Sequence, residues 1–156
     1  MIGKLKDMLS GLVDVPAEQA DDLALDLAVA VLMVEMARAD HQLDAAEEQA
    51  IQAQLEKEFG MNAEQGAQLL SRARELVEDS VSLHEFTRTI HESMDYDEKQ
   101  RVIEMLWRVA LADYSLDKYE DYLIAKIGEL LYVSRGDVMR LKHRVVQDIR
   151  PVDADD

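Results

Sequence analysis

The fold is decided by a stretch that the chain uses twice: ARADHQLDAAEE at residues 37–48 returns as ALADYSLDKYED at residues 110–121. The second copy begins 73 residues after the first (110 − 37). Outside the two copies the similarity continues at three further pairs: Val29/Val102, Ile51/Ile124 and Phe59/Tyr132. Because repetition at a fixed offset marks a unit that is used more than once, we expect two halves related by a pseudo-two-fold axis. The halves span about residues 20–79 and 82–149.

Composition favours one helical domain over residues 1–156. The chain is 48% apolar and contains only 2 Pro and 6 Gly, so little in it interrupts a helix. It has no Cys, which excludes disulfides, thiolate metal sites and cysteine catalysis. The N-terminus does not resemble a secretory signal, and the longest apolar run, residues 27–34, is far shorter than the roughly 20 residues of a membrane span. We therefore expect a soluble, cytoplasmic protein.

The net charge of −16 restricts the partners. A strongly acidic protein is repelled by phosphate backbones, so we expect no nucleic-acid partner, and protein partners, a homodimer among them, or cations are favoured instead. Residues 135–150 are the exception, with five basic residues against two acidic ones. We expect this basic last helix to face the acidic body of the same molecule.

Helix starts are marked by capping boxes, in which a side-chain acceptor is followed three residues later by an acid or an amide. Six such pairs occur: Asp44/Glu47, Asn62/Gln65, Ser82/Glu85, Asp95/Glu98, Asp117/Glu120 and Ser134/Asp137. They predict helices that end near residues 59, 78, 92, 112 and 131 and before Pro151. No alternating β-branched run competes with them, so the predicted fold is all-α, compact, with seven or eight helices.

Two helices are expected at the centre of the domain. The apolar run at residues 27–34 lies in a helix from about residue 18 to residue 39, and its counterpart at about residues 97–112 is nearly as apolar. A helix without a polar face is buried on every side, so these two helices should pack together, with Trp107 as a core anchor. Five methionines are interpreted as core filler, with an adaptable groove as the alternative: Met33, Met36, Met94, Met105 and Met139.

The ends of the chain carry two further features. Residues 2–12 can form a short amphipathic helix, which we expect to dock on the body and to give at most weak peripheral contact with a membrane. Residues 151–156 form an acidic tail. Neither feature changes the expectation of a single domain.

Each copy of the repeat places three acids at one helix–helix corner. The candidate metal ligands are Asp40, Asp44, Glu47, Asp113, Asp117 and Glu120. Carboxylate oxygens suit hard cations, so Ca²⁺ or Mg²⁺ is favoured, while His41 as a nitrogen ligand would move the preference toward Zn²⁺. If the two corners meet across the pseudo-two-fold axis, six carboxylates converge.

Helix capping alone explains part of this pattern. Asp44 with Glu47, and Asp117 with Glu120, satisfy the free N–H groups of a helix start and suit the positive end of its dipole. Capping does not explain Asp40 and Asp113, because an acid at the end of a helix faces the negative end of the dipole. An Asx turn and a ligand role both remain open for these two residues.

Motifs of catalysis are missing from the sequence. It contains no His-Glu-x-x-His, no Gly-rich phosphate loop, no nucleophile elbow and no EF-hand loop. His84 and His91 share a helix face with Arg88 between them, and we interpret them as surface residues. We therefore expect no enzymatic activity.

Two copies of Ala-Asp-x-x-Leu-Asp-x-x-Glu, each after a buried helix, resemble the TerB-like (tellurite resistance protein B) family over roughly residues 20–149. The resemblance implies a compact, two-repeat helical domain of bacterial tellurite and stress-response systems, found also in the N-terminal part of a membrane-anchored DnaJ-type co-chaperone. It further implies divalent-metal binding by the six corner acids. The chain departs from the family at His41 and Tyr114, where members often carry Gly.

Three functional hypotheses follow, in order of preference. The first is a non-enzymatic TerB-like module that binds protein partners and a divalent cation in a stress response. The second is a purely structural or adaptor module without metal, in which the acidic corners only cap helices. The third, a metal-dependent hydrolase, ranks last because no general base or substrate-positioning group stands near the motifs.

Overall fold

The computed structural model of the protein describes residues 20–38, 43–78, 83–112 and 116–149. Within these ranges the chain forms helices and no strands, which confirms the all-α prediction. Seven helices are described: α2 (Ala20–Ala37), α3 (Ala45–Phe59), α4 (Ala63–Glu78), α5 (Leu83–Ser93), α6 (Tyr96–Ala110), α7 (Lys118–Leu130) and α8 (Arg135–Ile149). Their bounds lie close to those expected from the capping boxes. The expected helix at residues 2–12 and the tail at 151–156 lie outside the described residues.

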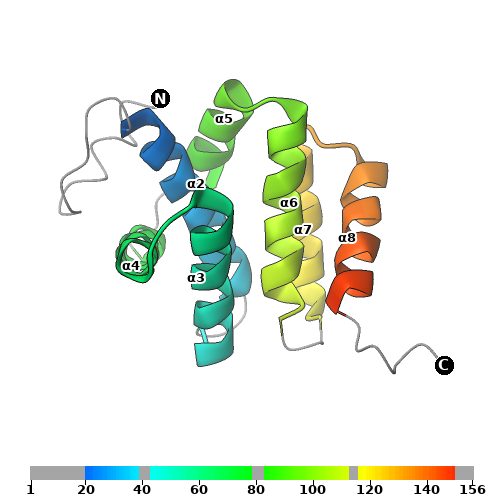
Figure 1. Ribbon diagram of the computed structural model, residues 1–156. Coiled ribbons are helices and arrows are strands. Elements are labelled where there is room, and N and C mark those ends of the chain that lie inside the picture. Colours follow the sequence, from blue (N-terminus) through cyan, green and yellow to red (C-terminus); the bar gives the residue numbers. More distant parts are fainter. Residues whose placement is uncertain (1–19, 39–42, 79–82, 113–115, 150–156) are drawn as a thin grey trace.

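The core is organised around α2, which contacts α3, α4, α5, α6 and α7 (Figure 1). Its residues 27–34 are at most 3% exposed, as expected for a helix without a polar face. The expected packing of α2 against α6 is confirmed. Figure 1 shows α6, α7 and α8 on one side of the molecule and α4 on the other.

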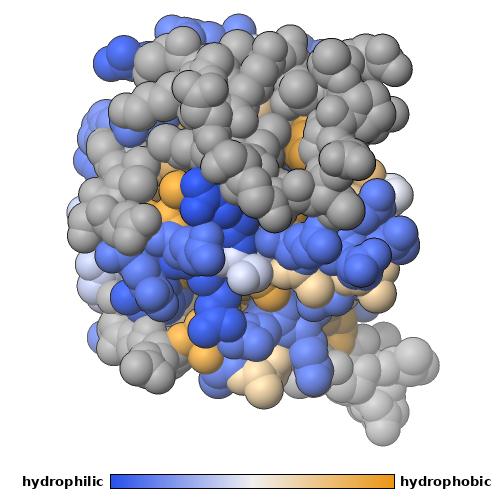
Figure 2. All heavy atoms as spheres, turned by 90° about the vertical axis from the view of Figure 1, so that its left-hand side faces the viewer, coloured by the Kyte–Doolittle hydropathy of each residue, from blue (hydrophilic) through white to orange (hydrophobic). Residues whose placement is uncertain are grey.

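The side that carries α4 is mostly hydrophilic wherever its residues are described (Figure 2). Among the described helices, none is long and apolar enough to cross a membrane. Even α2, the most apolar of them, finds its partners inside the protein, because five helices surround it.

Three of the predicted capping boxes form complete pairs of hydrogen bonds. At α3 the box joins Asp44 and Glu47, and at α6 it joins Asp95 and Glu98. At α4 the N–H of Gln65 donates to Asn62 Oδ1 over 2.8 Å, and the N–H of Asn62 donates to Gln65 Oε1 over 3.0 Å. Each box satisfies two N–H groups that a helix start leaves without partners, which is why the starts could be read from the sequence.

The helices α3 and α7 end in the same Schellman motif. At α3, Gly60 has a φ of 65° and the N–H of Met61 bonds the carbonyl of Glu56 at 3.2 Å. At α7 the left-handed residue is Tyr132, with a φ of 61°, and the N–H of Val133 bonds the carbonyl of Gly128 at 2.9 Å. A left-handed tyrosine carries a steric cost that glycine avoids, so the end of α7 is held by its surroundings.

Those surroundings include His91, and here the surface interpretation was wrong. The ring of His91 is half-buried and lies 4.4 Å from the ring of Tyr132, centroid to centroid. Its Nδ1 also contacts the ammonium group of the buried Lys99. His84, in contrast, is exposed as expected.

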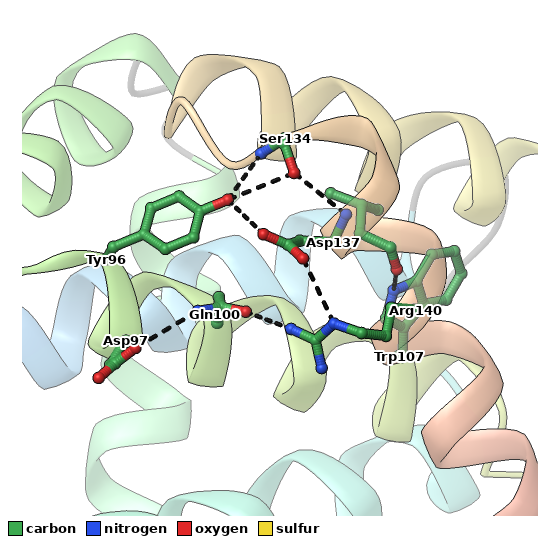
Figure 3. A network of polar contacts seen from close by, with 8 residues as sticks. Tyr96, Asp97, Gln100, Trp107, Ser134, Asp137 and Arg140 are labelled. Atoms are coloured by element: carbon green, nitrogen blue, oxygen red, sulfur yellow. Dashed lines mark hydrogen bonds and ion pairs between the residues drawn. The ribbon is translucent and has the colours of Figure 1, made fainter.

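The start of α8 is fastened to α6 by a polar network (Figure 3). The hydroxyl of Tyr96 accepts the N–H of Ser134 at 3.1 Å and donates to Asp137 at 2.6 Å. Arg140 bonds Asp137 and also reaches Gln100 on α6. These contacts lower the pKa of the Asp137 carboxyl, mainly through the hydrogen bond from Tyr96.

A second contact joins α8 to α7. Lys142 of the basic last helix pairs with Asp121 of α7, in agreement with the expectation that this helix faces the acidic body.

Changing Tyr96 to phenylalanine is expected to lower the free energy of unfolding by about 1 kcal/mol, because two hydrogen-bonding groups at the start of α8 lose their partner. Urea unfolding followed by circular dichroism measures the loss. The matched control is Tyr119→Phe, since the hydroxyl of Tyr119 forms no hydrogen bond with any described residue. Equal losses in both variants would contradict a capping role for the Tyr96 hydroxyl.

Candidate acidic site at two helix starts

Four of the six candidate ligands lie at the starts of two helices. Asp44 and Glu47 belong to the first turn of α3, and Asp117 and Glu120 belong to the first turn of α7. Asp40 and Asp113 lie outside the described residues, as do His41 and Tyr114.

At α3 the two acids cap the helix in the predicted way. The N–H of Glu47 donates to Asp44 Oδ1 at 2.8 Å, and the N–H of Asp44 donates to Glu47 Oε1 at 3.1 Å. At α7 the arrangement differs slightly. Asp117 accepts the N–H of Tyr119 at 2.7 Å, and Glu120 accepts the N–H of Asp117. All four acids therefore take part in capping.

The two corners meet through Glu47 and Glu120, whose carboxyl groups are hydrogen-bonded to each other. Glu120 is only 3% exposed and Glu47 is half-buried. A carboxylate can only accept, so a hydrogen bond between two carboxyl groups requires one of them to hold a proton. Burial, followed by the hydrogen bond and charge of Glu47, raises the pKa of Glu120 to about 8. The charge of Asp117 also raises the pKa of Glu120. The hydrogen bond that Glu120 accepts from the N–H of Asp117 lowers this pKa and so opposes the other effects.

Such a pair can exchange its shared proton for a divalent cation. The proton neutralises one of the two carboxyl groups, and a divalent cation bound after the proton leaves would neutralise both. The first turns of α3 and α7 fix the side chains that would bind the ion. Within the part of the chain that the structure describes, no group of three acidic or histidine side chains is placed to hold a metal ion. The described residues thus supply two carboxyl groups in contact rather than a full ligand set.

The fourth acid of each copy has another partner. Glu48 pairs with Arg74 of α4 at 2.6 Å, and Asp121 pairs with Lys142 of α8 at 3.4 Å. Each ion pair joins a helix that begins at an acidic corner to the helix that follows it. Sequence reasoning missed both pairs, because the partners are more than twenty residues apart and no local pattern connects them.

Sequence reasoning also missed Asp26, which lies in the buried helix α2. Burial, and secondly the charge of Asp22 one turn earlier, raise the pKa of the Asp26 carboxyl to about 7. The sequence did contain an indication of this, because Asp26 directly precedes the apolar run at residues 27–34. Asp26 is therefore a second group that titrates far above its usual range.

Comparison with known families gives one match. The model of the family described as tellurite resistance protein TerB matches residues 26–143, about three quarters of the chain. The match spans both acidic corners and all of α3 to α7. Comparisons with curated proteins and with solved structures give no match. The chain belongs to the tellurite resistance protein TerB family.

Proposed function

We propose that this TerB-family protein is a non-enzymatic module that binds a divalent cation at the Glu47–Glu120 pair and works through protein partners in a tellurite or stress response. The observation that carries the proposal is the contact between the two carboxyl groups. They come from two helix starts that lie far apart in the sequence. Two acids would repel each other there unless a proton or a cation joined them.

The described residues supply only the two carboxyl groups of the pair as ligands. The further acidic ligands proposed are Asp40 and Asp113, which precede the capping residues Asp44 and Asp117 in the sequence by four residues. A set composed of oxygen donors favours Ca²⁺ or Mg²⁺ over Zn²⁺. Backbone carbonyls and water would complete the coordination.

Cation binding at this site competes with a proton. Because Glu120 holds its proton up to about pH 8, each cation that binds near neutral pH displaces that proton into solution. The apparent affinity for the cation should therefore rise with pH up to about 8. This dependence separates binding at the pair from binding at ordinary surface carboxylates, which lose their protons near pH 4.

The proposal predicts a saturable thermal stabilisation of the metal-free protein by one of four ions, Ca²⁺, Mg²⁺, Mn²⁺ or Zn²⁺. An ion at about 100 times its Kd stabilises the fold by about 2.7 kcal/mol, which moves the thermal midpoint by several degrees. The shift should be larger at pH 8 than at pH 6. It should disappear in both Glu47→Gln and Glu120→Gln, because each variant removes one of the two charges that hold the ion.

The matched control is Glu98→Gln. Glu98 occupies the same place in the capping box of α6 as Glu47 does in that of α3, and it is exposed. A cation response that Glu98→Gln retains and Glu47→Gln loses assigns the effect to the pair. A flat response to all four ions would contradict the metal site and favour the structural alternative, in which the pair shares only a proton.

A further inference from the structure

One face of α7 carries four residues in a stripe: Lys118, Tyr122, Ala125 and Glu129. Their spacing of four, three and four residues places them along one side of the helix, as in the seam of a coiled coil. The Tyr122 side chain is 64% exposed, and its ring stands edge-on to the exposed ring of Tyr119 at 6.3 Å. The centre of the stripe, Tyr122 and Ala125, carries no charge in a protein with a net charge of −16.

A cavity of about 330 Å³ lies beside the stripe, between α7 and α8. Trp107, Val133 and Val138 line it, and Met139 stands at its rim, 40% exposed. Met139 is thus not the core filler that the sequence suggested. Aromatic residues and Met, with Arg135 near them, are the residue types enriched at protein interfaces.

The two charged ends of the stripe are placed against the dipole of their own helix. Lys118 is the first residue of α7, near its positive end, and Glu129 lies in the last turn, near its negative end. Each placement is locally unfavourable by a few tenths of a kcal/mol or more. Neither side chain makes an ion pair with any residue that the structure describes. Within the described residues, neither charge is therefore neutralised by an ion pair.

The stripe is complementary to the same stripe of a second copy that runs in the opposite direction. When two α7 helices lie antiparallel about a two-fold axis between Leu123 and Ile124, Lys118 stands opposite Glu129 of the other copy. In the same register Tyr122 stands opposite Ala125, so a large side chain meets a small one. The symmetry repeats both pairs, which is the self-complementarity that an isologous dimer needs.

We propose that this face of α7, with the adjoining start of α8, is the interface between two copies of the chain. Each Tyr122 ring enters the cavity beside the Ala125 of the other copy, with Trp107 as its floor. Opposite charges close both ends of the seam. The stripe itself is neutral, with one Lys and one Glu, so two acidic molecules can approach each other here with less repulsion than elsewhere.

The small size of the interface favours weak association. Three turns of paired helix bury less than the roughly 1,200–2,000 Å² of a stable complex, even with Met139 and Arg135 added. We therefore expect a concentration-dependent dimer rather than a permanent one. The side of the molecule opposite α4, where α6, α7 and α8 lie together, is the side that pairs (Figure 1).

Sedimentation velocity tests the proposal over about 1 µM to about 1 mM protein, the range of weak dimers. The unchanged chain is expected to form dimers as its concentration rises. Lys118→Glu and Glu129→Lys should each raise the dimer dissociation constant at least tenfold, because each places like charges opposite each other at both ends of the seam. The double variant Lys118→Glu/Glu129→Lys restores opposite charges and should dimerise again. A mixture of the two single variants should form heterodimers.

Loss of folding in the single variants would not explain a dimerisation that is lost in them and restored in the double variant. Both single changes bring the helix charges into agreement with the dipole, so the thermal midpoint of the monomer should stay the same or rise. Glu58→Lys and Arg88→Glu are the matched controls, since both residues are exposed on other helices and should leave dimerisation unchanged. A monomer at every concentration would overturn the proposal. Undiminished dimerisation of the single variants, or failure of the double variant to restore it, would also overturn it.

Discussion

Replacing Trp107 with alanine is expected to lower the free energy of unfolding by about 3–5 kcal/mol. The side chain is 1% exposed and lies where α6 faces α8. Its Nε1–H donates to the carbonyl of Val138 at 3.0 Å, and the ammonium of Lys142 lies 5.3 Å from the ring centroid. Truncation removes the packed ring, the hydrogen bond and the cation–π contact together. It also leaves a cavity between α6 and α8.

The variant Trp107→Phe separates packing from hydrogen bonding. It keeps most of the buried ring but loses the N–H group, so we expect a smaller loss of about 1–2 kcal/mol. Urea unfolding at low protein concentration measures both variants without a contribution from dimerisation. A loss below about 1 kcal/mol for Trp107→Ala would show that the contact between α6 and α8 adds little to stability.

The helices could be predicted because their starts are local. A capping box needs only two side chains three residues apart, and Asp44/Glu47 and Asp95/Glu98 form it whatever the distant chain does. The central position of α2 followed from its composition, since a helix that is apolar all round must be buried. The fold class and the order of helices were therefore within reach of the sequence.

Apart from the packing of α2 against α6, most contacts between helices could not be predicted from the sequence. The bond from Ser134 to Tyr96 and the ion pair of Glu48 with Arg74 join residues with no shared local pattern. The left-handed conformation of Tyr132 was also hidden, because glycine is the residue that signals it. The duplicated acidic motif raised the contact of Glu47 with Glu120 only as a condition, since the sequence could not show whether the two corners meet. The pseudo-two-fold relation itself stays a prediction.

The stability of the metal-free protein is expected to fall as pH rises from about 5 to about 8, by a few kcal/mol in total. The cause is mainly Glu120, whose pKa is raised from 4.5 to about 8 in the folded protein. The unfolded chain releases this proton near its usual pKa while the folded chain keeps it. Each rise in pH within that window therefore favours the unfolded state. Asp26, raised from 3.8 to about 7, acts in the same direction in the lower part of the window.

Urea unfolding at a series of pH values, with a chelator present, measures this slope. Glu120→Gln should remove the decline between about pH 7 and pH 8 and reduce it below pH 7, since an amide donates the same hydrogen bond to Glu47 without a proton to lose. Asp26→Asn should reduce the decline below about pH 7 and leave it unchanged above that pH. An unchanged slope in Glu120→Gln would show that the pair does not hold its proton.

Repeating the pH series with the stabilising cation joins this prediction to the proposed site. A cation bound at the Glu47–Glu120 pair takes the place of the proton, so the folded protein no longer loses stability when Glu120 ionises. The decline with pH should then vanish or reverse in the unchanged chain, and the variant Glu120→Gln should show no such rescue. A pair that served only to join α3 and α7 through a shared proton would keep its decline at every cation concentration, because nothing would replace the lost proton.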